Sequence, residues 1–415
     1  MKIQFNAKPM TKKTLVLLCL ILLAFIGQAQ INSKFIQSHI KILSSDSLEG
    51  RGTGTAGEKL AISYIQSQWS KIGLLPKGDG KLYTQKFTFK GGIHGTGEEG
   101  TAYNIVGFID NKAANTIVIG AHFDHLGLGN QGSSLDANPQ NKIHNGADDN
   151  ASGVAGVIEL ARYFQTNKIK ESTNFLFLCF SGEELGLYGS KYFTENPTID
   201  LTKVSYMINT DMIGRLDPQS KSLAVSGTGT SAVWEPLLKK ISSEKLLIKT
   251  DSAGVGPSDH TSFYLKNIPV LHFFTGSHGD YHKPSDDVEK INIEGEKEIL
   301  ELIIRLVENL DKQPKLTFLP TKNKSMGSTR AFKVTMGVMP SYTYSEEGLK
   351  IDGVTDGKSA QKAGIAAGDV ILQIGAYSIK DIQSYMDALG KFEKGQIVPV
   401  KLKREKEIIT LNVTF

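Results

Sequence analysis

Two adjacent glutamates, Glu183 and Glu184, follow a run of seven residues, 174–180, that are almost all apolar, aromatic or small. Such a run is typical of a strand buried on both faces of a parallel sheet. Two carboxylates at the end of a buried strand are costly unless positive charge lies beside them. A divalent metal would supply that charge, with one glutamate as a ligand and the other free to transfer protons. In isolation such a pair more often belongs to a solvated loop.

Further potential ligands occupy comparable places in the chain. His122, Asp211 and His282 each come just past a predicted strand, and Asp149 opens a predicted helix. Together with Glu184 they provide two imidazoles and three carboxylates, a set that suits zinc better than calcium or magnesium. One carboxylate that bridges two metals would use all five residues and leave room for a bridging water. Each residue alone has a structural alternative, such as a helix cap for Asp149 or an ion pair with Arg215 for Asp211.

The elements that would hold these residues alternate along the chain. Apolar runs predict strands at 83–89, 102–109, 116–121, 174–180, 206–209, 223–225 and 268–274, and helical periodicity predicts helices near 33–43, 62–72, 154–164, 234–241 and 294–310. This order predicts an α/β fold with a mostly parallel sheet flanked by helices. In such sheets ligands bind beyond the carboxyl ends of the strands, which is where the candidate residues fall. A glycine- and threonine-rich segment, 48–59, precedes the second helix; no strand leads into it, which argues against phosphate binding.

The first 29 residues have the features of a secretory signal peptide. Lys12 and Lys13 precede an apolar run, 15–26, and small residues at 27–29 suit a cleavage site. The run is shorter than the roughly 20 residues that a membrane anchor needs. Because four lysines and no acidic residue would leave with the signal, the mature chain would hold 43 basic and 43 acidic residues. We therefore expect an exported protein, periplasmic or secreted, with no stable membrane span and no nucleic-acid partner. Cys179 would be its single cysteine, so no internal disulfide could form.

Six motifs carry a resemblance to a known family. GAHFDHLG, GADDNASG, SGEELGLYGS, NTDMIGR, GPSDHTSF and YHKPSDD occur in the order and spacing found in co-catalytic zinc aminopeptidases of the aminopeptidase Y and bacterial leucyl aminopeptidase type. The similarity covers roughly residues 43–310 and implies the zinc exopeptidase fold. It implies two zinc ions per chain, one bound by His122, Asp149 and Asp211 and the other by Asp149, Glu184 and His282. It also implies a cis peptide bond between Asp149 and Asn150.

The resemblance further implies a role for each remaining site residue. Glu183 would act as general base on the metal-bridging water and return the proton to the leaving amine. Asp124 would hydrogen-bond His122 from behind the metal site and fix its tautomer. Tyr281 occupies the position where some relatives place an oxyanion-stabilising tyrosine. Structural roles are expected for Asp259 and for the other histidines of the region: His125, His144, His260, His272 and His278. Asp286 would orient His282 or cap the last helix.

The resemblance implies a peptidase that removes N-terminal residues from peptides with a free N-terminus. Two alternatives remain open. One is a glutaminyl cyclase, which shares the architecture but uses one zinc; the full ligand set, including His122, argues against it. The other is a binding protein that keeps metal for stability and performs no catalysis, which would have no need of a free glutamate at position 183.

A second unit follows the predicted zinc peptidase domain, 30–311. Prolines, lysines and the absence of periodicity predict a linker at 312–325. Residues 326–415 resemble a small β-rich PDZ domain, through TMGVMP at 335–340 and the motif AGIAAGDVIL at 363–372. Strands are expected at 333–338, 349–354, 370–374 and 398–403, and a helix at 382–389. The resemblance implies that a C-terminal peptide adds as a strand, with its carboxylate on backbone amides of 336–338. A packing module that binds nothing is the alternative.

Overall fold

The computed structural model describes residues 30–90, 99–130, 133–321, 334–340, 344, 346–354, 357–380 and 382–415. The predicted signal peptide, 1–29, and the last four residues of the predicted linker, 322–325, lie outside these ranges. In the described residues no helix combines the length and apolar character needed to cross a membrane.

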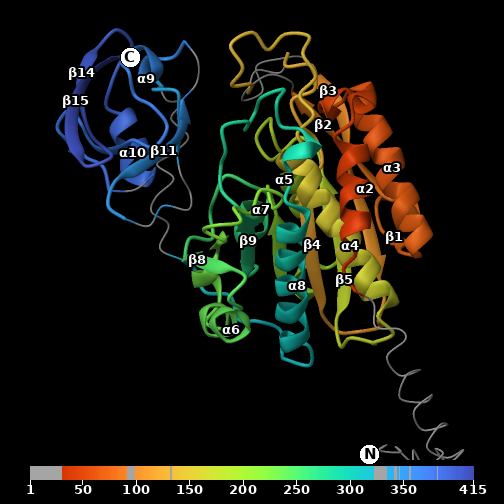
Figure 1. Cartoon of the computed structure of the whole chain (residues 1–415). Helices are drawn as coiled ribbons and strands as arrows, with labels where there is room; N and C mark the ends of the chain where they lie inside the picture. Colours follow the sequence, from red (N-terminus) through yellow and green to blue (C-terminus); the bar gives the residue numbers. More distant parts are fainter. Residues whose placement is uncertain are drawn as a thin grey trace, which may run out of the picture.

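A nine-stranded sheet forms the centre of the first domain, in the order β1-β3-β5-β4-β6-β9-β7-β8 with β2 paired to β3 (Figure 1). The strands are β1 Leu75–Pro76, β2 Thr84–Lys90, β3 Glu99–Ile109, β4 Thr116–His122, β5 Asn174–Phe180, β6 Val204–Thr210, β7 Ser222–Ser226, β8 Leu247–Asp251 and β9 Val270–Phe274. The four central strands, β5, β4, β6 and β9, are parallel, whereas β3 runs antiparallel to β5 and β7 antiparallel to β9. The sheet is therefore mixed, and the expectation of a mostly parallel sheet holds for its centre.

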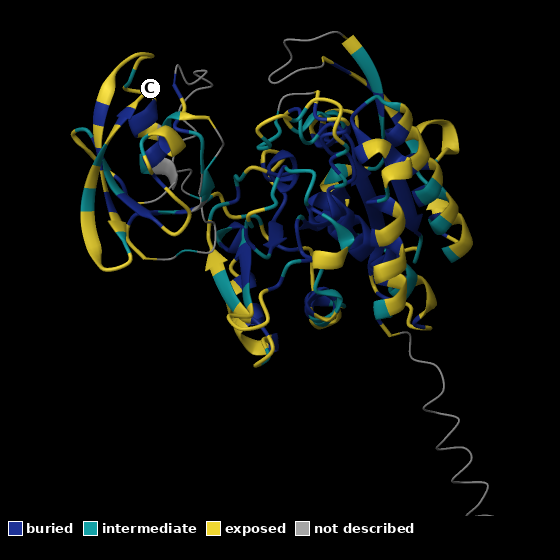
Figure 2. Ribbon diagram, turned by 45° about the horizontal axis from the view of Figure 1, so that its top comes forward, coloured by how far each residue is buried: buried dark blue, intermediate teal, exposed yellow. Residues whose placement is uncertain are grey.

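Helices cover both faces of this sheet. The helices are α2 Ser33–Leu43, α3 Ala56–Ile72, α4 Gly153–Thr166, α5 Tyr188–Glu195, α6 Trp234–Ile241, α7 His260–Tyr264 and α8 Ile293–Leu310. Residues of α2, α3, α4, α6 and α8 share one core with alternate residues of the strands, while α5 and α7 pack on the opposite face. Every residue of β4, β5 and β6 is buried, as expected for parallel strands covered on both sides (Figure 2).

The sequence patterns located most of these elements within two or three residues. They missed β8, whose residues are largely exposed, and the short helices α5 and α7. The seven-residue apolar run at 174–180 coincides with β5. Its alternate side chains enter the two cores, since Phe175 and Phe177 lie on one face and Leu176 and Leu178 on the other.

The C-terminal domain has its own six-stranded sheet, in the order β10-β11-β12-β14-β15 with β13 paired to β12. Its elements are β10 Val338–Pro340, β11 Leu349–Val354, α9 Ser359–Lys362, β12 Val370–Ile374, β13 Tyr377–Ser378, α10 Ile382–Leu389, β14 Ile397–Arg404 and β15 Glu407–Thr414. A separate buried core holds it together. Three of the four predicted strands and the predicted helix are found, whereas β13, β15 and α9 were missed. The fourth prediction, 333–338, is wrong for residues 334–337, which are not strand; residue 333 lies outside the described residues.

Candidate metal centre

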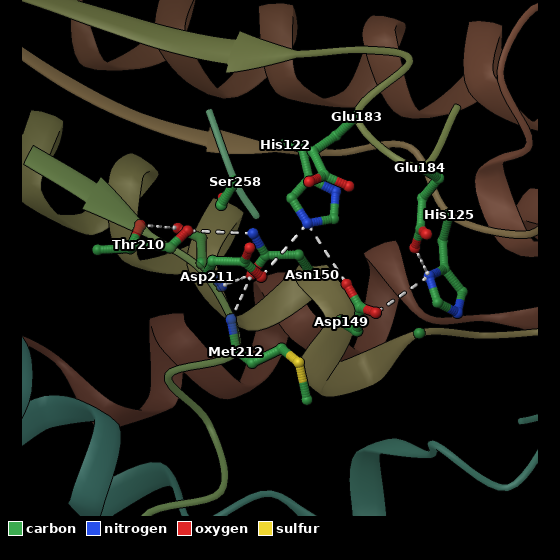
Figure 3. A network of polar contacts seen from close by, with 12 residues as sticks. His122, His125, Asp149, Asn150, Glu183, Glu184, Thr210, Asp211, Met212 and Ser258 are labelled. Carbon is green, nitrogen blue, oxygen red and sulfur yellow. Dashed lines mark hydrogen bonds and ion pairs between the residues drawn. The ribbon is translucent and has the colours of Figure 1, made fainter. Parts of the chain in front are cut away.

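The ends of the parallel strands bring predicted site residues close together, and Figure 3 shows five of them: His122, Asp149, Glu183, Glu184 and Asp211. His122 is the last residue of β4 and lies opposite Phe180, the last residue of β5. Glu183 and Glu184 follow in the turn beyond β5, and Asp211 comes directly after β6. Asp149 lies in the segment Ala147–Ser152, which precedes α4 and has non-helical backbone angles at Asp149 and Asn150. His282 lies in the loop after β9.

His122, Asp149 and Asp211 form a first group of potential metal ligands. The Nε2 atom of His122 lies 3.4 Å from Oδ1 of Asp149 and 3.3 Å from Oδ1 of Asp211. The Nδ1 atom of His122 lies 3.2 Å from the backbone carbonyl oxygen of Asp124. A proton on Nδ1 would be donated to that carbonyl, and Nε2 would then be free to bind a metal.

A second group forms around the other oxygen of Asp149. Asp149 Oδ2 lies 3.2 Å from Nε2 of His282, and the same nitrogen is 3.1 Å from Oε2 of Glu184. Nδ1 of His282 lies 2.9 Å from the carbonyl oxygen of Ser133, which again leaves Nε2 directed at the carboxylates. The two oxygens of Asp149 therefore face two different groups of donors, as a bridging ligand requires.

His125 also belongs to this second group, although the sequence predicts only a structural role for it. Its Nδ1 atom lies 2.7 Å from Oε1 of Glu184 and 3.8 Å from Oδ2 of Asp149. The residue is fully buried, and its Nε2 atom has no hydrogen-bond partner among the described residues. The signal in the sequence was the second histidine of the HFDH motif, three residues after His122.

The carboxylates of the centre favour positive charge on the groups beside them. Burial opposes the charged form of His122, yet the carboxylates of Asp211 and Glu183 raise its pKa well above the usual range. The pKa of His282 is likewise raised against burial, mainly by Glu184. Burial would raise the pKa of Glu184, but His282 lowers it to about 2. A divalent cation would supply the same compensation, and imidazole with carboxylate donors suits zinc.

Asp124 contacts different groups from those expected. Its carboxylate lies 3.8 Å from Nδ1 of His122, beyond hydrogen-bond distance, and the backbone carbonyl takes that place. The carboxylate instead accepts hydrogen bonds from Thr53 Oγ1 at 2.8 Å and from the backbone N–H of Glu183 at 3.2 Å. Asp124 therefore connects the ends of β4 and β5. The hydrogen bond predicted between His122 and the Asp124 carboxylate is replaced by one to the Asp124 backbone carbonyl.

Asp286 neither orients His282 nor caps α8. Its Oδ2 atom accepts the backbone N–H groups of Asp148, at 2.9 Å, and Asp149, at 3.1 Å. The cap of α8 is Asn292, whose side chain accepts the N–H of Gly295. Asp286 thus fixes the backbone of the segment that carries the shared ligand.

The peptide bond between Asp149 and Asn150 is cis, as the family resemblance implied. The Asn150 side chain joins this segment to the end of β6. Its Oδ1 atom accepts the N–H groups of Gly153 and Met212, and its Nδ2 group donates to the carbonyl of Thr210 (Figure 3).

Tyr281 lies beside the second group. Its ring stacks on that of His282, with centroids 3.9 Å apart, and packs against a small apolar cluster of Met212, Ala224 and Phe274. Arg215 pairs with Asp280 at 3.0 Å, so its partner is not Asp211. The other residues predicted to be structural, Asp259, His144, His260, His272 and His278, are all buried or nearly so.

Comparison with known proteins identifies two domains in the chain. Residues 104–307 match the model of peptidase family M28, and residues 331–415 match that of the PDZ domain. Over 194 residues the chain is 27% identical to leucine aminopeptidase 2 of Trichophyton equinum, covering 44% of this chain and 38% of that protein. Over 261 residues it is 26% identical to leupeptin-inactivating enzyme 1 of Streptomyces exfoliatus, covering 62% and 52%. The chain thus spans about half, or less, of the length of these relatives.

Two solved structures show the same fold. A Zn-dependent exopeptidase from Parabacteroides distasonis superposes with a TM-score of 0.55 at 18% identity, over 68% of this chain and 99% of that one. A glutaminyl cyclase from Bacteroides thetaiotaomicron superposes with a TM-score of 0.53 at 17% identity, over 68% and 98%. The fold alone therefore does not separate these two activities. The family matches give the assignment: the chain contains a peptidase family M28 domain followed by a PDZ domain.

Proposed function

We propose that this protein is an exported two-zinc aminopeptidase that removes N-terminal residues from peptides. The observation that carries the proposal is the position of Asp149, whose two carboxylate oxygens face two separate groups of donors. His122 and Asp211 complete one zinc site, and Glu184 and His282 complete the other. The match to peptidase family M28 supports this reading, since a peptidase needs a site that activates water.

The chemistry divides between the bound metals and the chain's own residues. Zinc bound in these groups would lower the pKa of a coordinated water and polarise the scissile carbonyl. Glu183 is the residue that takes up the proton and returns it to the departing amine. Burial raises the pKa of Glu183 well above its usual range, so this carboxylate accepts a proton more readily than that of an ordinary glutamate.

The contacts of the two adjacent glutamates support different roles for them. Glu184 is occupied by His125 and His282. The Glu183 carboxylate accepts no hydrogen bond within the part of the chain that the structure describes, while its backbone N–H is held by Asp124. One glutamate is thus fixed as a ligand, and the other is available to move a proton. Tyr281, stacked on His282, is assigned to stabilise the oxyanion that forms at the scissile carbonyl.

A single-zinc glutaminyl cyclase is the alternative that the fold allows. The first donor group argues against it, because His122 and Asp211 lie 3.3 Å apart and both approach the shared Asp149. A cyclase with one metal would have no use for this first group in addition to the second. A metal-stabilised binding protein would equally have no use for Glu183 in its present place.

The flanking regions complete the proposal. Residues 1–29 would be the signal peptide that directs export to the periplasm or beyond, 30–311 the peptidase domain, 312–325 the linker and 326–415 the PDZ domain. The PDZ domain would bind the C-terminus of a peptide or protein, with backbone amides around Gly337 receiving its carboxylate. Gly337 has φ of +70°, a conformation that favours glycine and turns successive amides toward one side.

Mass spectrometry of a defined peptide mixture tests the activity. Peptides with free and with acetylated N-termini would be incubated with the mature protein, before and after chelation. Stepwise loss of N-terminal residues from free peptides, abolished by chelation and restored by zinc, is expected. Pyroglutamate formation without cleavage would establish the cyclase instead, and an unchanged mixture would favour the binding protein.

A further inference from the structure

Residues 50–58 of the glycine- and threonine-rich segment lie outside the matched family region, yet Glu58 hydrogen-bonds Ser181 in the turn that carries Glu183. It begins at the end of a 3-10 helix, Asp46–Arg51, and runs into α3. Gly50 has φ of +66°, and a Cβ atom there would lie 2.4 Å from the carbonyl oxygen of His144. The segment is thus packed tightly against the loops of the metal centre.

Arg51 anchors this segment to both ligand-bearing loops. The side chain is fully buried, and its guanidinium donates to the carbonyl oxygens of Phe123 at 2.8 Å, Asn145 at 2.7 Å and Gly146 at 3.0 Å. Phe123 follows the ligand His122, and Gly146 precedes the segment that contains Asp149. The backbone of Arg51 also accepts the N–H of His125 at 3.2 Å.

Two further side chains of the segment are connected to the turn after β5, Thr53 through Asp124 and Glu58 through a direct hydrogen bond. Thr53 Oγ1 donates to Oδ2 of Asp124 at 2.8 Å, and Oδ1 of the same carboxylate accepts the N–H of Glu183. Glu58 hydrogen-bonds the hydroxyl of Ser181 through Oε1 and accepts the N–H of Gly54 through Oε2, at 2.9 Å. The side chains of these residues are buried, apart from that of Glu183, which is half-buried. The turn is therefore held at two points by one distant segment of the chain.

We propose that Thr53 and Glu58 are positioning residues of the reaction, which hold the turn 181–184 so that the Glu183 carboxylate faces the metal centre. The effect of Thr53 would pass through the carboxylate of Asp124, and that of Glu58 through the hydroxyl of Ser181. A general base displaced by a fraction of an ångström loses proton-transfer efficiency while the substrate still binds. This inference rests on the proposed role of Glu183.

The test compares Thr53→Val, which keeps the shape and removes the hydroxyl, with Thr53→Ser, which keeps the hydroxyl. Thr228→Val is the matched control, because Thr228 is also buried and its hydroxyl donates to a backbone carbonyl far from the site. The zinc-loaded full chain would be used, with zinc content measured in each sample. Thr53→Val is expected to lower kcat about 10-fold or more with KM unchanged, as loss of an outer contact does in metal enzymes. Thr53→Ser should restore most of the loss, and Thr228→Val should leave kcat unchanged.

Hydrogen exchange gives a readout that does not depend on cleavage. In Thr53→Val, peptides that cover 181–187 should exchange faster, with unchanged exchange in β4. Ser181→Ala, which removes the contact of Glu58, should have the same local effect. Unchanged exchange at 181–187 in both variants would overturn the inference, whatever their activity. Equal losses of kcat in Thr53→Val and Thr228→Val would also overturn the inference, because they would indicate general destabilisation. If the wild-type protein cleaves no peptide, the proposed function fails, and the exchange comparison still decides whether Thr53 holds the turn.

Discussion

Asp149 Oδ2 lies 3.2 Å from Nε2 of His282, while the other oxygen of the same carboxylate faces His122 at 3.4 Å. One side chain thus joins two donor groups that come from different parts of the chain. Its backbone is fixed by Asp286, which accepts the N–H of Asp149. The position of this carboxylate accounts for how five ligands could serve two metals.

Replacement of the shared ligand should affect both metals. Asp149→Ala is expected to lower zinc content from two to well below one per chain at limiting zinc, because each group loses a donor. Asp211→Ala should remove only one zinc, since Asp211 belongs to one group. Elemental analysis after dialysis against a weak chelator measures both. Equal stoichiometry in the two variants would contradict a bridging role for Asp149.

The two histidines of the second group should differ in their effect. His282→Ala is expected to remove one zinc at saturation, because His282 is proposed as a ligand. His125→Ala should keep two zinc ions at saturation but weaken the affinity of one by about 10–100-fold, the usual effect of losing an outer contact to a ligand. Competition with a fluorescent zinc chelator measures both affinities. If His125→Ala lost one zinc at saturation and His282→Ala only weakened the zinc affinity, His125 would be the ligand and His282 the supporting residue.

Much of the site could be predicted because parallel strands end at a common edge. The positions of His122, Glu184 and Asp211 directly after apolar runs were visible in the sequence, and strand pairing alone brings them together. The central strands could also be predicted, because burial on both faces leaves a continuous apolar run.

The parts that the sequence did not reveal depend on long-range contacts. The role of Asp286 depends on a hydrogen bond to a residue 137 positions away, and that of Thr53 on a carboxylate 71 positions away. His125 could be placed only by the path of the loop after β4. The antiparallel outer strands were likewise not evident, because local patterning does not show the direction in which a strand pairs.

The stability of the protein should depend on pH through Glu58. Burial raises the pKa of this carboxyl to about 8, from 4.5 for an ordinary glutamate. Between these values the folded protein keeps a proton that the unfolded chain has released, so the free energy of unfolding falls as the pH rises. The loss is at most about 1.4 kcal/mol per pH unit.

Glu58→Gln should remove this dependence, because the amide does not titrate in this range. Denaturant unfolding of the chelated protein at pH 5, 6, 7 and 8 measures the effect. The difference in stability between the wild type and the variant should shift in favour of the variant as the pH rises. A constant difference across this range would show that Glu58 is already ionised at pH 5.

The PDZ domain should recognise a free carboxylate. Isothermal titration of the full chain with a library of peptides is expected to find saturable binding for some C-termini, and amidation of the same peptides should abolish it, because the backbone amides around Gly337 need an anion. The experiment would use Glu183→Gln protein to prevent cleavage. Absence of saturable binding across a diverse library would favour a packing role for this domain.

The most direct test of the account is the Glu183→Gln variant, measured for zinc content and turnover in the same preparation. The amide cannot take up a proton, and Glu183 contributes no atom to either donor group. We expect two bound zinc ions, unchanged thermal unfolding and a kcat lowered by about 100-fold or more. Near-normal kcat with both metals in place would contradict it, because some other residue would then be the base.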